Sequence, residues 1–396
     1  MKPINAQRLK RFARQQLGLD AYLRDIGDGR PRPQIAAATL VWALVIGQIA
    51  RRISYHGVQE LVRLARPQLE VARRFSDDTL GYCTERLDAS KLRQALGNTL
   101  RRAKRNKAFE NSRWIGLALD GTGAGHVTQE HCVLCHPLRN ADDRIIGYLH
   151  HFSLVSIVGT GISLPVDVEP WGPGDCEYEA SQRLLTRAVG ALGRRFADYV
   201  AGDGLYATAP FLNAATALGL YAVARLKDNL PNLYEAAQLY FGSRPPTDTF
   251  LHGTDQVELW DAEGFPPWED LSWERVRVLR YRQHKADGTV VEAYWLTSFP
   301  RALCGSRALF HLAKSRWDIE NHGFNDGKTY HGMEHVRHHH ANSVLIDWLL
   351  IVLALVIERL FRLRFLHRGK SAPLPAQTFV TYLWLSFGPS RRINTS

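Results

Sequence analysis

The stretch Trp114-Ile115-Gly116-Leu117-Ala118-Leu119-Asp120 places an acidic residue at the end of an apolar run, and it decides how the fold is interpreted. The stretch Tyr199-Val200-Ala201-Gly202 is likewise followed by Asp203, and a third acid, Glu320, lies in a pattern typical of a helix. A carboxylate at the end of a buried strand is costly unless it is paired or coordinates a cation. The sequence therefore predicts that Asp120, Asp203 and Glu320 converge in the fold to bind divalent metal.

The basic charge of the chain is concentrated at its N-terminal end. The sequence has 396 residues, is 45% hydrophobic and carries a net charge of +11, so it is long enough for two or three domains. Residues 1–110 hold 22 Lys and Arg against 10 Asp and Glu. Such an excess is typical of a DNA-binding part, because neutralised phosphates supply most sequence-independent affinity. A basic surface that serves only solubility is the alternative.

Cysteine usage and hydropathy favour a cytosolic protein. Five cysteines form no even framework, and residues 1–17 lack the apolar stretch of a signal peptide. The apolar runs 35–49 and 348–357 are shorter than the roughly 20 residues of a membrane-spanning helix. We expect both runs to form buried helices, and we expect no membrane association.

The periodicity of the sequence divides it into a helical part and a mixed part. Helices are expected at 6–18, 34–52, 57–65, 76–87 and 90–107. Beyond residue 110 the expected elements are a strand at 114–120, a hairpin of 148–158 and 162–168, a helix at 176–192, a strand at 199–202, a helix at 207–218 and a strand at 221–225. Short β-like runs follow up to residue 300, and helices return from residue 306 and at 344–365.

Several strings around the three acids resemble one enzyme family. They are Asp120-Gly121-Thr122, Gly202-Asp203-Gly204-Leu205-Tyr206 with Pro210-Phe211, and Arg316-Trp317-Asp318-Ile319-Glu320-Asn321 with Gly323-Phe324-Asn325 and Lys328. Together with Asp175-Cys176-Glu177, they resemble the DDE transposases of bacterial insertion sequences, in the insertion-sequence-four-like superfamily. The resemblance covers roughly residues 70–362. Ala313 stands where hairpin-forming members usually have Tyr.

The order of elements and the resemblance together imply an α/β fold. A ribonuclease-H-like mixed sheet with helices would be interrupted by a β-rich insertion and preceded by an all-helical domain. In that fold the ends of the first and fourth strands lie side by side. The expected parts are a helical, basic DNA-binding domain at 1–110, a first core part at 111–226, a β-rich insertion at 227–303, a second core part with C-terminal helices at 304–365, and a tail at 366–396.

The resemblance implies a two-metal mechanism with Mg²⁺ or Mn²⁺. Asp120 would bridge two ions, and Asp203 and Glu320 would each hold one. Strand cleavage would expose a 3′-hydroxyl, which would then attack a second phosphodiester. Hard oxygen ligands match these ions better than zinc.

Basic side chains are the candidates for DNA-phosphate contacts. Arg316 and Lys328 flank Glu320, and the other candidates are Arg101, Arg102, Lys104 and Arg105 at the end of the 90–107 helix. Alternatively, Arg316 pairs with Asp318 or Asp326. The expected partners are double-stranded DNA, as the terminal inverted repeats of the element and the target, and a second copy of the chain. We expect a cytoplasmic bacterial protein that is nucleoid-associated when bound to DNA.

Two other enzyme-related interpretations stay open. A metal-dependent nuclease would cut DNA without strand transfer, and a transposase-derived protein without activity would only bind it.

A pair of cysteines suggests a second type of metal site. Cys132 and Cys135 have the spacing of a zinc knuckle, and the nearby histidines His131, His136, His150 and His151 could complete a structural Zn²⁺ site. The alternatives are two free thiols in a loop, or covalent haem through the C-x-x-C-H pattern. Five histidines also lie within residues 331–340, where a solvated or phosphate-facing loop is the alternative to a metal site.

Overall fold

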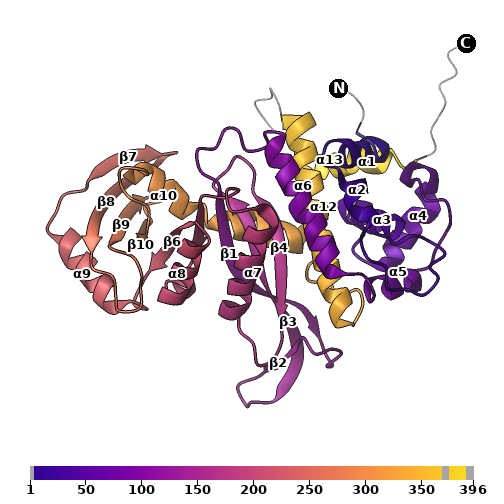
Figure 1. The fold of residues 1–396 in the computed structure, drawn as a ribbon, viewed down its shortest axis with the longest axis horizontal. Coiled ribbons are helices and arrows are strands. Elements are labelled where there is room, and N and C mark those ends of the chain that lie inside the picture. Colours follow the sequence, from indigo (N-terminus) through magenta and orange to yellow (C-terminus); the bar gives the residue numbers. More distant parts are fainter. Residues whose placement is uncertain (1–3, 368–373, 389–396) are drawn as a thin grey trace, which may run out of the picture.

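A ten-stranded mixed sheet lies at the centre of the protein (Figure 1). The computed structural model describes residues 4–367 and 374–388. The strands are β1 (Gly116–Val127), β2 (Cys135–Arg139), β3 (Ile145–Val158), β4 (Leu164–Trp171), β5 (Tyr199–Gly202), β6 (Tyr221–Leu226), β7 (Asp248–His252), β8 (Asp255–Phe265), β9 (Val276–His284) and β10 (Val290–Thr297).

The sheet has the order β2-β3-β1-β5-β6-β10-β9-β8-β7, and β4 also pairs with β3. The β1–β5 and β5–β6 pairs are parallel, and the other pairs are antiparallel. Strand β5 lies in the middle and is buried along its whole length, which explains its continuous apolar run. The expected α/β class is confirmed.

Helices cover the sheet and form a separate layer beside it. They are α1 (Ala6–Gln15), α2 (Leu19–Arg24), α3 (Ala37–Ile49), α4 (Tyr55–Leu69), α5 (Asp77–Thr84), α6 (Ala89–Arg105), α7 (Glu177–Leu192), α8 (Ala209–Ala217), α9 (Pro231–Gly242), α10 (Ser306–Lys314), α11 (Asp326–His331), α12 (Ala341–Arg362) and α13 (Ala376–Leu385). A π-helical segment, Ile319–Asn325, connects α10 to α11, and a second one, Leu363–His367, follows α12.

Helix α12 joins the N-terminal helices to the sheet. It packs on α3, α5 and α6 on one side and on β4 on the other, and Figure 1 shows it beside α6. Both long apolar runs are buried helices, as expected, since they form α3 and the middle of α12. Tyr55 donates a hydrogen bond to buried Asp347, and Arg337 pairs with the same carboxylate at 3.3 Å. Within the described residues, no helix is long and apolar enough to cross a bilayer.

Five elements differ from the sequence-based expectation. Strand β2 was not expected. Helix α2 was not expected, and α4 continues through Pro67, with a kink at Ala65, instead of ending before it. Strand β1 does not end at Asp120, because its glycine-rich continuation stays paired with β3 as far as Val127. The segment 227–303 begins with helix α9, whereas only short strands were expected there.

The segment 227–303 extends the central sheet. Its last strand, β10, pairs with β6, and β9, β8 and β7 follow outward. A second hydrophobic cluster fills the space between these strands and α10, with Trp295, Tyr281 and Phe310 fully buried in it. The division of the chain into the parts given above stays a prediction. Residues 368–373 and 389–396 of the expected tail lie outside the described residues.

Candidate active site

Asp120 and Asp203 lie at the same level on neighbouring strands. The parallel register pairs Gly116 with Tyr199 and Ala118 with Ala201, so the same offset brings position 120 level with position 203. Adjacent strands are about 4.8 Å apart. Asp203 itself follows β5 and caps the turn Gly204–Tyr206 by accepting a hydrogen bond from the Leu205 N–H at 2.9 Å. The expectation that the two strands lie side by side is confirmed.

Glu320 approaches Asp120 through a shared arginine. Arg316 Nη1 lies 3.6 Å from Asp120 Oδ2, and Arg316 Nη2 lies 2.6 Å from Glu320 Oε1. The guanidinium is 10% exposed, whereas the carboxylates of Asp120 and Glu320 are 19% and 41% exposed. Arg316 therefore pairs with two of the three acids, and not with Asp318 or Asp326.

A π-helical backbone presents Glu320 to the sheet. Segment Ile319–Asn325 packs on β1 and β3, and a Cβ at Gly323 would stand 2.9 Å from a methyl group of Leu154. Glycine thus permits close contact with β3. π-Helical turns are rare and concentrate at functional sites.

Glu177 is a fourth carboxylate at the same place. It opens α7, and a Cβ added at Gly121 would lie 2.1 Å from its Oε2, so any larger residue next to Asp120 would require the Glu177 side chain to move. Glu177 Oε1 accepts a hydrogen bond from Tyr206 at 3.0 Å, and this fully buried tyrosine also lies 2.9 Å from Ser181 Oγ. Sequence reasoning did not assign Glu177 to the site, although its place at the start of a helix after the hairpin was a usable signal.

The clustered acids change one another's protonation. Burial raises the pKa of Asp120 to about 7, and the negative charges of Glu320, Glu177 and Asp203 add to this effect, while Arg316 opposes it. Burial also raises the pKa of Glu177, and Asp203 contributes in the same direction. Mutual electrostatic effects of this kind place all four carboxylates in one negatively charged cluster.

The carboxylates are neighbours without being at the spacing of metal ligands. Across residues 4–367 and 374–388, the one group of three ligand atoms within 4.8 Å of each other is Cys132, Cys135 and His150. Lys328 Nζ donates to Gly123 O, three residues beyond Asp120 on β1, at 3.1 Å and pairs with Glu334 at 2.8 Å.

The basic residues expected to bind DNA divide into two groups. Arg102 donates to the carbonyl groups of Gln15 and Gln16, and Lys104 donates to those of Arg195 and Phe196, so both hold elements together. Arg101 and Arg105 are exposed. They line an open hollow of about 760 Å³ between α6 and the loop before β5, to which Arg194 and Arg195 also contribute.

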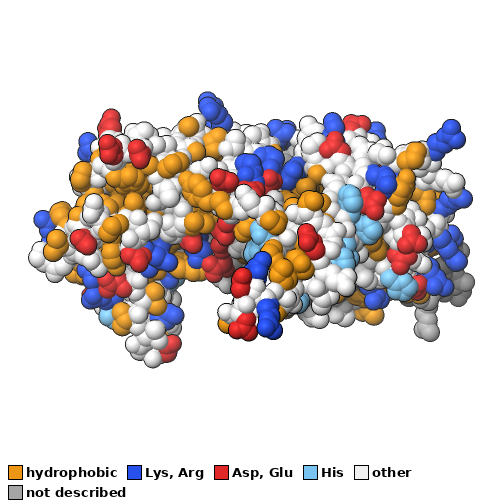
Figure 2. Space-filling view, turned by 90° about the horizontal axis from the view of Figure 1, so that it is seen from below, with side chains coloured by type: hydrophobic (Ala, Val, Ile, Leu, Met, Phe, Trp, Pro, Cys, Tyr) orange, Lys and Arg blue, Asp and Glu red, His pale blue; other side chains and the backbone are white. Residues whose placement is uncertain are grey.

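The histidines of residues 331–340 do not share one site. His331 is buried between Arg51 and Glu358, and His338 pairs with Glu85 at 2.7 Å. The ring of His339 lies against that of His131 in a tilted arrangement, at a centroid distance of 4.1 Å. Figure 2 shows histidine side chains gathered on the lower face of the molecule, among acidic and basic groups.

Comparisons with known proteins leave the family open. No family model matches this sequence, and no curated protein matches it. Among solved structures, the chain is similar to the piggyBac transposase, in a cryo-EM structure of its synaptic complex with hairpin DNA. The TM-score is 0.47 and the sequence identity 11%, and the match covers 98% of this chain and 80% of that chain. A likeness this remote does not assign a function, so the proposal below depends on the geometry of the site.

Proposed function

We propose that this protein is a DDE transposase that cuts DNA at the ends of an insertion sequence and joins the ends to a target. The observation that carries the proposal is the carboxylate cluster. Asp120 and Glu320 share Arg316, Asp203 stands level with Asp120, and Glu177 is packed against the strand. A half-buried group of acids with one arginine among them is an unusual cost to stability, and such sites are typically functional.

The strand order supports a ribonuclease-H-like core. Three antiparallel strands, β4, β3 and β1, are followed by two parallel ones, β5 and β6, with α7 and α8 as the connections. Asp120 lies on the first of these strands in the chain and Asp203 directly after the fourth, as the resemblance implies. The insertion between the second and third acids then continues the sheet outward from β6.

The donor set of the cluster fits Mg²⁺ or Mn²⁺. Asp120, Asp203 and Glu320 offer only carboxylate oxygens, which hard divalent cations prefer. The raised pKa of Asp120 means that negative charge in the cluster lacks compensation, which a bound cation would supply. When two such ions are bound, they activate water and stabilise the leaving oxygen of a phosphodiester.

The other groups of the site position the substrate. Lys328 contacts β1 at Gly123, three residues beyond Asp120, and can bind a phosphate as a point charge. Arg316 can bind a phosphate in a bidentate manner when it is released from Asp120 and Glu320. We propose double-stranded DNA as the partner, bound also by the exposed Arg101 and Arg105. Pairing of two element ends requires at least two copies of the chain, so we propose a dimer on DNA.

A strand-transfer assay tests the proposal. The full chain is incubated with Mg²⁺, labelled DNA that carries element ends, and a target plasmid. Joined products support a transposase, nicks alone indicate a nuclease without strand transfer, and binding alone indicates an inactive DNA-binding descendant. We expect Asp203→Asn to abolish cleavage and to leave end binding nearly unchanged. Cleavage retained by this variant would remove Asp203 from the site.

A further inference from the structure

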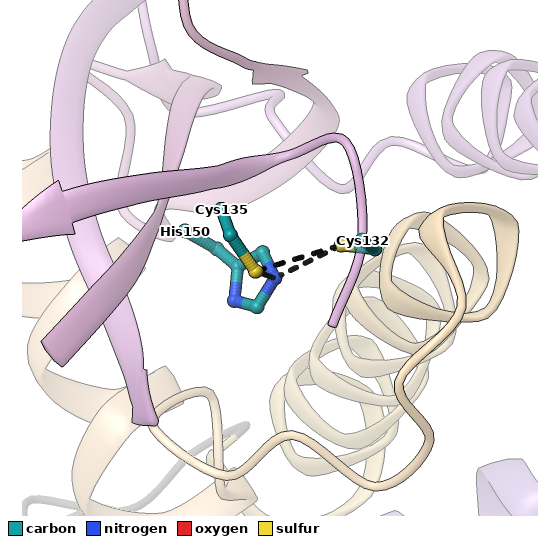
Figure 3. A group of neighbouring side chains, drawn as sticks. All are labelled: Cys132, Cys135 and His150. Carbon is teal, nitrogen blue, oxygen red and sulfur yellow. Dashed lines mark hydrogen bonds between the residues drawn. The ribbon is translucent and has the colours of Figure 1, made fainter. Parts of the chain in front are cut away.

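Three side chains of the types that ligate metals converge beside strands β2 and β3 (Figure 3). Cys132 Sγ and Cys135 Sγ are 3.9 Å apart, and His150 Nε2 lies 3.3 Å from the first sulfur and 3.5 Å from the second. Cys132 lies in the loop before β2, Cys135 begins β2, and His150 is on β3. Cys135 and His150 lie opposite each other in the antiparallel pair of β2 and β3, and this register brings their side chains together.

The distances match those around a tetrahedral zinc ion. With Zn–S bonds of about 2.3 Å and Zn–N bonds of about 2.05 Å, tetrahedral angles place two sulfurs about 3.8 Å apart and a sulfur and a nitrogen about 3.6 Å apart. Each observed distance is within about 0.3 Å of these values. A disulfide would need the sulfurs at about 2.05 Å, which this arrangement does not provide.

The surroundings of the ligands also suit a metal. Cys135 and His150 are 2% and 1% exposed, so they are shielded from solvent. The His150 Nε2 atom is the ring nitrogen directed at the two sulfurs. The other ring nitrogen, Nδ1, is buried beside Gly125 and has no hydrogen-bond partner among the described residues.

A fourth ligand is available from a distant part of the chain. The ring of His339 lies against that of His131, the residue before Cys132, at a centroid distance of 4.1 Å. It is exposed and lies in the segment that leads into α12. We propose that Cys132, Cys135 and His150 bind a structural Zn²⁺ ion and that His339 is its fourth ligand.

The proposed ion would cross-link the hairpin of β2 and β3 to the segment before α12. Without it, the contacts between these two parts include the ring pair of His131, in the loop before β2, and His339. The site is independent of the proposed DNA chemistry, because it shares no residue with the acidic cluster. Loss of zinc and loss of strand transfer can therefore be measured separately.

Metal analysis of the full chain tests this inference. The untagged protein is reduced, loaded with Zn²⁺ and desalted, and its zinc content is measured by mass spectrometry. We expect one zinc per chain, and we expect the Co²⁺-substituted protein to show the visible bands of a tetrahedral thiolate site. A wild-type protein that retains no zinc and shows no such bands overturns the site, as does an intact mass that reveals a Cys132–Cys135 disulfide under reducing conditions.

Variants locate the ion. Cys135→Ser should lose the zinc, whereas Cys176→Ser, which changes an exposed cysteine, should keep it. His339→Ala should retain zinc with an affinity reduced by at least about tenfold. Zinc content unchanged in Cys135→Ser would place the ion elsewhere and overturn the site, and unchanged affinity in His339→Ala would overturn the assignment of the fourth ligand. If Cys135→Ser does not fold, the presence or absence of tetrahedral thiolate bands in the Co²⁺-substituted wild type decides whether these cysteines bind the ion.

Discussion

Replacement of Asp120 by Asn should stabilise the protein at neutral and alkaline pH. Burial and three neighbouring acids raise the pKa of this carboxyl from 3.8 to about 7. A shift of about 3 units corresponds to about 4 kcal/mol, and because the side chain is 19% exposed, solvent screening reduces this to about 2–4 kcal/mol. Asp120 Oδ1 accepts a hydrogen bond from the Gly121 N–H at 3.0 Å. Asn keeps an oxygen that can accept this bond, and it carries no charge.

The pH dependence of the effect follows from the direction of the shift. Because the folded protein holds the Asp120 proton more tightly than the unfolded chain, its stability falls as pH rises from about 4 to about 7. The loss of folding free energy caused by the ionised Asp120 is absent below this pH range and complete above it. The difference between Asp120→Asn and wild type should therefore be near zero at pH 4 and reach about 2–4 kcal/mol at pH 8.

Urea denaturation at both pH values, with and without Mg²⁺, measures the difference. Mg²⁺ should stabilise the wild type at pH 8 and leave Asp120→Asn nearly unchanged, because a bound cation compensates only the charged carboxylate. The exposed Asp142→Asn variant is the control and should behave as wild type at all conditions. Equal stabilisation of Asp120→Asn at pH 4 and pH 8, or none at either, would refute the electrostatic account of the cluster.

Three further changes test other parts of the site. Arg316→Met should lower stability at pH 8 by about 3–5 kcal/mol, which Mg²⁺ should partly restore in the same urea titrations. The double change Arg101→Ala with Arg105→Ala should weaken DNA binding for all sequences and lower the slope of log K against log salt by about 2 in a filter-binding series. Gly121→Ala should abolish cleavage, and Glu177→Ala in the same chain should recover its lost stability if the clash with Glu177 is the cause.

Local patterns predicted the elements that the sheet buries on both faces. The apolar run before Asp203 became β5, and the helix expected at 76–87 became α5. Long apolar runs identified α3 and α12, since burial leaves a strong composition signal. The neighbouring position of Asp120 and Asp203 followed from the order of elements together with the family resemblance.

Such local patterns did not predict contacts between residues that are far apart in the sequence. The pairing of Arg316 with Asp120 joins residues that are far apart in sequence, and nearer acids offered equally good charges. Helix α9 was missed although Leu233, Ala237 and Phe241 are buried at a spacing of four residues, because Pro, Gly and Trp nearby suggested strands and turns. The continuation of β1 was missed because its glycines resemble a loop, whereas Gly121 serves to admit Glu177.

The placement of α12 has a consequence for biosynthesis. Helix α3 is apolar and buried, and part of its cover is α12, which the ribosome produces about 300 residues later. At a rate of synthesis of about 5–20 residues per second, α12 is made roughly 15–60 seconds after α3. During this interval the apolar surface of α3 is exposed on the nascent chain, so chaperones that bind nascent chains should associate with it early. A chain truncated before residue 341 should aggregate.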